Sequence, residues 1–119
     1  MDIAFDNSSG TFVLRVSGDM RLWNREKGNE RLLDLLRARK DLPKRMILNL
    51  AEVEQLDSLG VGALARVLVE CGKQEIDLTV VLPTGIAGKV LGVVHIFDAY
   101  PAFPNEAAAV RASLGTATG

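Results

Sequence analysis

The strongest constraint on the fold of this chain is a regular alternation of apolar, strand-like runs with segments of helical period. The runs with the composition of strands are Phe12 to Val16, Met46 to Leu50 and Leu78 to Leu82. The segments with helical spacing are Asn24 to Lys40, Ser58 to Glu70, Thr84 to Val94 and Pro104 to Leu114. Strands joined by crossovers of roughly 10 to 15 residues pair in parallel with right-handed connections. We therefore predict an α/β fold, with a mostly parallel sheet of four or five strands and four helices.

The strands are predicted to differ in how they are buried. Every second residue from Phe12 to Val16 is apolar, as is typical of a strand. Ile3 to Phe5 can pair with this run as a short hairpin strand. The run from Met46 to Leu50 is almost continuously apolar, which is typical of a central strand buried on both faces. We expect Ala51 to Asp57 to form a loop, and we expect a short extended piece near Phe97 to Phe103.

The boundaries of the first two helices follow from capping and breaking residues. Asn24 to Lys40 places three leucines on one face, as expected of a helix that covers a sheet, and Pro43 ends this helix. Ser58 stands where the N-cap of the second helix belongs, because its hydroxyl can accept a hydrogen bond from a first-turn amide. Gly72 is the expected C-terminal cap of the same helix.

The last two helices are expected to use apolar faces in the same way. Thr84 caps the third helix. Its apolar residues are Ile86, Val90, Val93 and Val94. Pro104 opens the fourth helix, which should end before Gly115. Its apolar face carries Ala107, Val110 and Leu114. We expect residues 116–119 to be a frayed tail.

Length and composition limit the classes of protein to which the chain can belong. Its 119 residues, 48% hydrophobic and 24% charged, suit a single globular domain over residues 1–119. A formal net charge of -1 gives no drive toward nucleic acid or anionic lipid. No window reaches the roughly 18 apolar residues of a membrane span, and residues 1–6 lack the basic start of a signal peptide. We therefore expect a cytoplasmic protein.

Metal and disulfide chemistry is also restricted. Cys71 is the single cysteine and His95 the single histidine, so neither an intramolecular disulfide nor a four-ligand Cys/His zinc site can form. No carboxylates recur at the spacing of a calcium loop. We expect no metal and no cofactor, and we interpret Cys71 and His95 as packing residues.

The most informative motif begins at Asp57-Ser58 and continues as Leu59-Gly60-Val61-Gly62, opening a helix after a buried strand. As an isolated pattern, Ser58 is most simply a helix cap. In its context the chain resembles the STAS domains of anti-sigma-factor antagonists and sulphate transporters over nearly its whole length. The likeness rests on the features Gly18-Asp19, Leu48 to Val53, Asp57 to Gly62, Leu78 to Leu82 and Phe97 to Pro104.

This resemblance implies a STAS-like fold and a partner switch controlled by Ser58. In antagonists of the family, the matching serine is phosphorylated by an anti-sigma factor that is also a serine kinase. The unphosphorylated form binds the kinase and releases its sigma factor, the phosphorylated form dissociates, and a phosphatase restores the first state. We expect a monomer or weak homodimer that is not an enzyme and does not contact DNA. The residues expected to bind the partner are Asp19, Arg21, Trp23, Asp57, Ser58, Leu59, Gly60 and Val61.

Several of these positions carry a second interpretation or depart from the pattern of the antagonists. Many antagonists have serine, threonine or alanine in place of Leu59, and aspartate in place of Arg21 and of Asn49. The acidic residue that matches Arg21 lies near the surface shared with the kinase, so the reversed charge implies a different kinase or weaker phosphorylation. Arg21 can equally be a solvated arginine at a helix entry. Trp23 is either a binding anchor or a core residue.

Three other functions compete with this interpretation. Gly60 to Ala65 fits a loose G-x-G-x-x-A dinucleotide pattern, but nine residues separate it from Leu50, whereas the fingerprint follows its strand directly. A hydrolase is disfavoured because Ser58 lacks a G-x-S-x-G elbow and His95 lies in an apolar stretch. The stronger alternative is an unphosphorylated STAS scaffold, or a subunit of a transport or stress-signalling assembly, since a fold alone does not decide a function.

Overall fold

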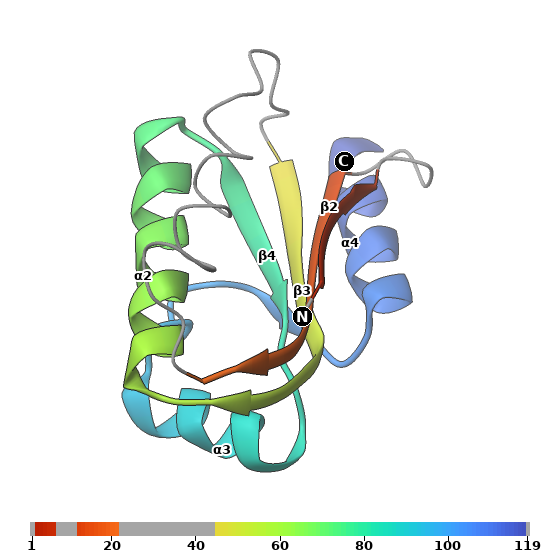
Figure 1. The fold of residues 1–119 in the computed structure, drawn as a ribbon. Coiled ribbons are helices and arrows are strands. Elements are labelled where there is room, and N and C mark those ends of the chain that lie inside the picture. Colours follow the sequence, from red (N-terminus) through yellow and green to blue (C-terminus); the bar gives the residue numbers. More distant parts are fainter. Residues whose placement is uncertain (1, 7–11, 22–44, 119) are drawn as a thin grey trace.

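The structure, a computed structural model, describes residues 2–6, 12–21 and 45–118. Its strands are β1 (Asp2–Asp6), β2 (Phe12–Met20), β3 (Arg45–Leu56), β4 (Asp77–Val81) and β5 (Ala102–Phe103). Its helices are α2 (Ser58–Lys73), α3 (Gly85–Val94) and α4 (Glu106–Thr118). Figure 1 shows their arrangement. The predicted helix over Asn24 to Lys40, its end at Pro43, and Trp23 lie outside the described residues.

The strands form one sheet in the order β1-β2-β3-β4-β5. β1 and β2 are an antiparallel hairpin in which Asp2 pairs with Ser17 and Asp6 with Val13. All other neighbouring strands are parallel. The predicted α/β fold with a mostly parallel sheet is therefore confirmed, and the apolar run at Met46 lies in β3, the central strand.

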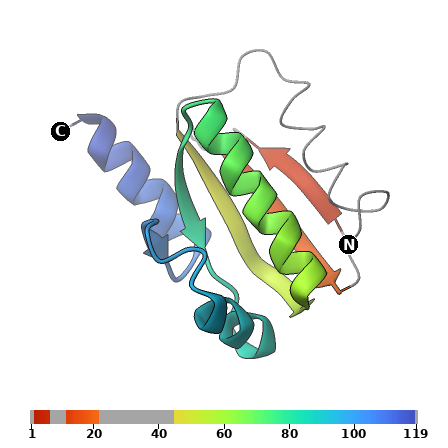
Figure 2. The same ribbon diagram turned by 90° about the vertical axis from the view of Figure 1, so that its left-hand side faces the viewer.

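The main core lies between the sheet and α2. Successive side chains of a strand point to opposite faces, so Leu14, Leu48 and Val80 share one face. There they pack with Leu64 and Val67 of α2, all fully buried. Figures 1 and 2 show α2 against this face, with α3 at the end of the sheet where β3 finishes.

A smaller core lies on the other face, under α4. It contains Val13, Ile47 and Val81 from the neighbouring strands together with Ala109 of α4, all fully buried or nearly so. The two sets of strand residues are adjacent in sequence, as expected of strands that are buried on both faces. The sheet thus sits between α2 and α4, as the edge-on view shows (Figure 1).

The loop predicted for Ala51 to Asp57 is wrong, because β3 continues to Leu56. The second half of β2 supplies a pairing partner for this extension, with Val53 opposite Gly18 and Leu56 opposite Met20. Irregularities of register near Gly18 keep the two strands paired, and Gly18 has a φ of 91°, which glycine adopts without steric cost. This extension of β3 could not be recognised in the sequence, because exposed glutamates interrupt the apolar pattern of the strand.

Several predicted helix ends are shifted. Gly72 does not cap α2: the helix continues to Lys73, and the N–H of Gln74 bonds to the carbonyl of Glu70 at 3.1 Å. Thr84 is the N-cap of α3 but makes no side-chain capping bond. At α4, the side chain of Asn105 accepts the N–H of Ala108 at 2.8 Å.

α4 also differs from its predicted extent. The helix starts at Glu106, after the capping Asn105, rather than at Pro104, and it continues through Thr118, beyond the end expected before Gly115. Its predicted inward face is partly wrong, because Ala107 is exposed while Ala109 is the fully buried residue. No described helix is both long and apolar enough to cross a lipid bilayer.

Of the four apolar residues predicted for α3, only Val90 packs against the main core. Ala87 and Leu91 are the buried residues of α3, whereas Ile86, Val93 and Val94 are exposed. His95 is likewise exposed rather than packed: it adopts a left-handed conformation as the C-cap of α3, and its Nδ1 lies 2.8 Å from a carboxylate oxygen of Asp98. Cys71 is buried on α2, as expected of a packing residue.

Candidate functional site

The carboxyl ends of β2 and β3 lie side by side and bring two segments of the predicted site together. Asp19 pairs with Gln55 and Met20 with Leu56 in the parallel ladder. The chain leaves β3 at Leu56 and enters α2 at Ser58, so the first turn of α2 begins beside the end of β2. Both views show this start of α2 next to the ends of the two strands (Figures 1 and 2).

Asp57, not Ser58, is the N-cap of α2. Its backbone is extended, and its carboxylate oxygen Oδ1 accepts the N–H of Leu59 at 3.0 Å and the N–H of Gly60 at 3.1 Å. Its carbonyl accepts the N–H of Val61 at 2.9 Å, the first bond of the helix. A carboxylate at the helix N-terminus also interacts favourably with the helix dipole. The predicted capping role of Ser58 is therefore wrong by one residue.

Ser58 occupies the first helical position after this cap, and its side chain is exposed. Among the described residues, none is hydrogen-bonded to its hydroxyl. The cap is formed by the neighbouring carboxylate, so the hydroxyl is not needed to satisfy the free amides of the first turn. The helix start thus presents a solvent-facing hydroxyl that contributes nothing to capping.

Gly60 lets α2 approach the sheet closely. A Cβ atom at this position would lie 2.6 Å from the carbonyl oxygen of Met20 and 2.6 Å from Cδ1 of Leu56, both closer than real Cβ contacts. At Gly62, by contrast, a Cβ atom would meet nothing within 4 Å. Gly60 is thus explained by packing against β2 and β3, and the dinucleotide pattern is not needed to account for it.

Asp19 and Arg21 form a charged pair beside this turn. Oδ2 of Asp19 accepts Nη2 of Arg21 at 2.6 Å, and Oδ1 accepts Nε at 3.0 Å and the backbone N–H of Arg21 at 2.8 Å. Hydrogen bonds from Arg21 lower the pKa of the Asp19 carboxyl, and the same interaction, aided by the charge of Asp57, raises the pKa of Arg21. The positive charge at Arg21 is therefore balanced within the site.

The remaining predicted residues differ in exposure. Leu59 is 47% exposed, Val61 is half-buried, and Gly60 is buried. Exposed Leu59 is a large apolar side chain next to Ser58, which suits contact with another protein. The structure brings the predicted binding residues other than Trp23 to one edge of the sheet, the edge formed by the carboxyl ends of β2 and β3. Trp23 lies outside the described residues.

Asn49 does not belong to this edge. It lies in the middle of β3, where its Nδ2 donates to Glu106 at 2.8 Å, and its Oδ1 accepts the N–H of Ala51 at 2.9 Å. Glu106, at the first turn of α4, also binds Arg15 of β2 in a two-pronged ion pair of 2.6 and 2.7 Å. Asn49 therefore helps to fix α4 to the opposite face of the sheet.

Ile86 is a residue of this edge that sequence reasoning missed. It lies in the first turn of α3, which follows β4, and its side chain is 59% exposed. Both views place α3 next to the start of α2 (Figures 1 and 2). The sequence of α3 is apolar on almost every side, so periodicity cannot indicate which apolar residue faces solvent.

The site has the features of a protein-binding surface. Within residues 2–6, 12–21 and 45–118, no three histidine, cysteine or carboxylate side chains gather as they do around a metal ion. The edge instead combines an exposed hydroxyl at Ser58, exposed apolar side chains at Leu59 and Ile86, and a balanced ion pair. Such a mixture of apolar and polar groups is typical of surfaces that bind another protein transiently.

Comparison with protein-family models matches residues 2–109 to the STAS domain. Since this match covers most of the chain, the protein belongs to the STAS domain family. Among solved structures, the chain is similar to an anti-sigma-factor antagonist (STAS) domain protein from Planctomyces limnophilus, with a TM-score of 0.70 and 19% sequence identity. That likeness covers 93% of this chain and 96% of the other, and it establishes a shared fold. No curated protein sequence matches the chain.

Proposed function

We propose that the protein is an anti-sigma-factor antagonist that is switched by phosphorylation of Ser58. In this proposal the unphosphorylated form binds an anti-sigma factor with serine kinase activity, which then releases its sigma factor in the cytoplasm. The kinase phosphorylates Ser58, the complex dissociates, and a phosphatase restores the binding form. The observation that carries the proposal is the exposed hydroxyl of Ser58 at the start of α2, next to a cap formed entirely by Asp57.

A phosphate at Ser58 is compatible with the folded domain. It adds about -1.5 to -2 charges at the amino end of α2, where the helix dipole favours negative charge by about 0.3 to 1 kcal/mol. The capping bonds to Leu59 and Gly60 come from Asp57 and do not use the modified oxygen. The fold and the cap therefore persist in both states, and the switch needs no conformational change.

The same phosphate is incompatible with a buried interface. Docking of a partner over Leu59 would remove water from the phosphate while the negative carboxylate of Asp57 lies beside it. Burial of an unpaired charge costs several kcal/mol, and a loss of about 2.8 kcal/mol already weakens binding a hundredfold. Repulsion and desolvation at the docking surface thus explain release.

The residues around Ser58 supply the apolar and polar contacts that an anti-sigma factor would need in order to bind. Leu59, next to Ser58, and Ile86, in the first turn of α3, are exposed apolar side chains that offer contact area, and the Asp19–Arg21 pair offers polar contacts. Because Arg21 is balanced by Asp19, we expect the partner to present a surface without a strong net charge at this point.

The proposal is tested by intact-mass and peptide analysis after incubation of the chain with ATP and a panel of anti-sigma factors that have serine kinase activity. We expect a single phosphate on Ser58 and none on the Ser58→Ala variant. Thr84→Ala is the matched control, because Thr84 is another exposed hydroxyl at a helix N-terminus on the same edge, and this variant should be phosphorylated normally. Stable binding of a partner without phosphorylation would instead identify a scaffold.

A further inference from the structure

The outer edge of β4 is only partly covered by β5. The ladder between them consists of the pairs Val80 with Ala102 and Val81 with Phe103. The first three residues of β4, Asp77 to Thr79, have no neighbouring strand on that side among the described residues. An uncovered strand edge presents backbone donors and acceptors that another chain can use.

Leu78 is the residue whose backbone faces this open edge. The N–H and C=O groups of successive strand residues point to alternate sides, and the N–H of Val80 donates to Pro101 on the outer side at 2.9 Å. The N–H and C=O of Leu78, two residues earlier, therefore point the same way. No hydrogen bond joins them to a described residue on that side.

Pro101 explains why β5 stops there. Extension of the ladder from Val80–Ala102 would place the N–H of residue 101 opposite the carbonyl of Leu78. Proline has no N–H, so this bond cannot form. The preceding segment also turns away, because the N–H of Tyr100 donates to the carbonyl of Phe97 at 3.0 Å. Pro101 thus accounts for the end of the β4–β5 ladder at Val80.

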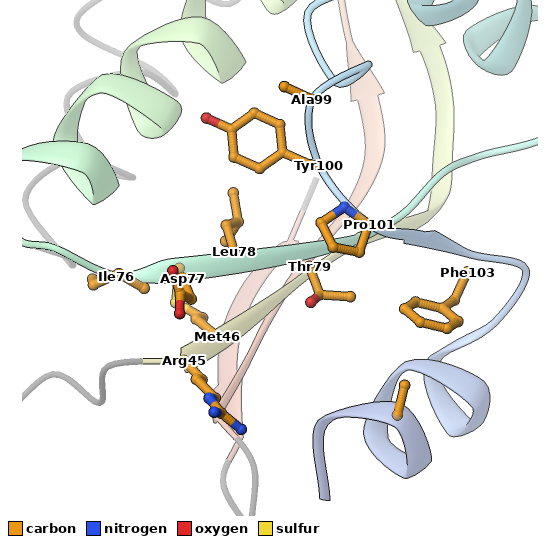
Figure 3. Close-up of a pocket in the computed structure, with 11 residues that line it drawn as sticks. Arg45, Met46, Ile76, Asp77, Leu78, Thr79, Ala99, Tyr100, Pro101 and Phe103 are labelled. Atoms are coloured by element: carbon orange, nitrogen blue, oxygen red, sulfur yellow. The ribbon is translucent and has the colours of Figure 1, made fainter. Parts of the chain in front are cut away.

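A groove of about 440 Å³ follows this edge, and it has a wall on each side. Tyr100 packs against the core on the α2 face of the sheet, whereas Phe103 packs against the core under α4. Figure 3 shows the two rings on opposite sides of β4, with α4 beside Phe103. Ala112 of α4 completes the second wall, and Asp77 and Arg45 lie at one end.

We propose that this groove binds an extended segment of a partner protein, which adds to the sheet along Asp77 to Thr79. The backbone of Leu78 supplies one donor and one acceptor to such a segment, as in other cases of strand addition. Side chains of an extended segment alternate between its two faces, so one contacts Tyr100 and the next contacts Phe103 and Ala112. We therefore expect the segment to carry alternate apolar side chains.

The two walls favour an extended segment over the sheet edge of a second copy of this chain. A second copy would bring its own Tyr100 segment and its own α4 to the same place, whereas a single extended segment of three residues needs only about 10 Å along the edge. The groove also lies toward the amino ends of β3 and β4, away from Ser58. A partner bound here can therefore remain bound in both phosphorylation states.

The test uses the full chain and a phage-displayed library of random linear peptides as the probe. Peptides selected on the wild-type chain are then titrated into isotope-labelled protein. We expect them to shift the backbone amide resonance of Leu78 and to slow its hydrogen exchange. The Ala112→Arg variant should weaken binding at least about tenfold, because the long side chain fills the groove.

Ala107→Arg is the matched control, since it adds the same charge to the same helix at an exposed position that does not line the groove. It should leave peptide affinity unchanged, and circular dichroism should show that both variants keep their helices. The proposal is overturned if no peptide shifts Leu78, or if Ala112→Arg and Ala107→Arg bind equally well. It is also overturned if sedimentation finds a dimer of this chain that Ala112→Arg dissociates.

Discussion

The carboxylate of Asp57 accepts the backbone N–H of Gly60 at 3.1 Å, and the hydroxyl of the intervening Ser58 remains outside this cap. The two adjacent residues therefore have separate roles at the start of α2. Asp57 stabilises the helix, while Ser58 can be modified without loss of the cap. This separation is the structural basis of the proposed switch.

The separation of roles predicts different effects of two adjacent substitutions. Asp57→Ala removes both capping bonds and should lower the free energy of unfolding by about 1 kcal/mol, within a range of about 0.5 to 2 kcal/mol. Ser58→Ala removes an exposed hydroxyl and should change it by less than about 0.5 kcal/mol. Urea denaturation measures both values. Equal losses for the two variants would mean that Ser58 contributes to the cap.

The close approach at Gly60 predicts that two glycines in the same helix respond in opposite directions. Gly60→Ala places a methyl group 2.6 Å from the carbonyl oxygen of Met20, and such overpacking should cost about 1 to 3 kcal/mol. Gly62→Ala meets open space and should stabilise the helix by about 0.5 to 1 kcal/mol. Thermal or urea unfolding distinguishes these outcomes, and a stabilising Gly60→Ala would contradict the packing described.

The burial of Cys71 predicts a loss of stability at high pH. Desolvation, together with the nearby charge of Glu70, raises the pKa of the Cys71 thiol from 9.0 to about 11. Because the folded state holds this proton more tightly, the contribution is complete below pH 9 and is lost as the pH rises through about 11. Relative to Cys71→Ala, the wild-type free energy of unfolding should therefore fall more steeply above pH 9. Parallel pH profiles would contradict this.

Ile86 should contribute to partner binding without contributing to stability. Ile86→Asp places a charge in the proposed docking surface and should weaken binding of the anti-sigma factor at least about tenfold. Val69→Asp is the matched control, because Val69 has the same 59% exposure but lies toward the other end of α2. Isothermal titration with the partner compares the two, and unfolding curves should show that both variants are folded. Equal affinities would place the docking surface elsewhere.

The order of the described strands and helices, and the central strand among them, could be predicted from the sequence because apolar runs and helical spacing alternate along it. The almost continuously apolar run from Met46 to Leu50 identified β3 as central, and the alternation at Phe12 identified β2. The length of β3 could not be predicted, because its second half depends on pairing with the distant end of β2. Long-range pairing leaves little trace in a local pattern.

The segments that form the candidate site could be singled out in the sequence, but the structural role of each residue there could not be assigned. Asp57 and Ser58 are both good N-cap residues, and only the backbone geometry distinguishes them. The ion pair of Asp19 with Arg21 depends on a turn that the sequence does not specify. The exposure of Ile86 could not be predicted, because α3 is apolar almost throughout and no periodicity distinguishes its buried side.

The proposed switch is tested most directly by the affinity of one kinase-type anti-sigma factor for the chain before and after phosphorylation of Ser58. We expect the phosphorylated chain to bind at least about a hundredfold more weakly, a difference of about 2.8 kcal/mol, while its circular dichroism spectrum and unfolding curve stay the same. Equal affinities of the two forms, with the phosphate confirmed on Ser58, would contradict the switch.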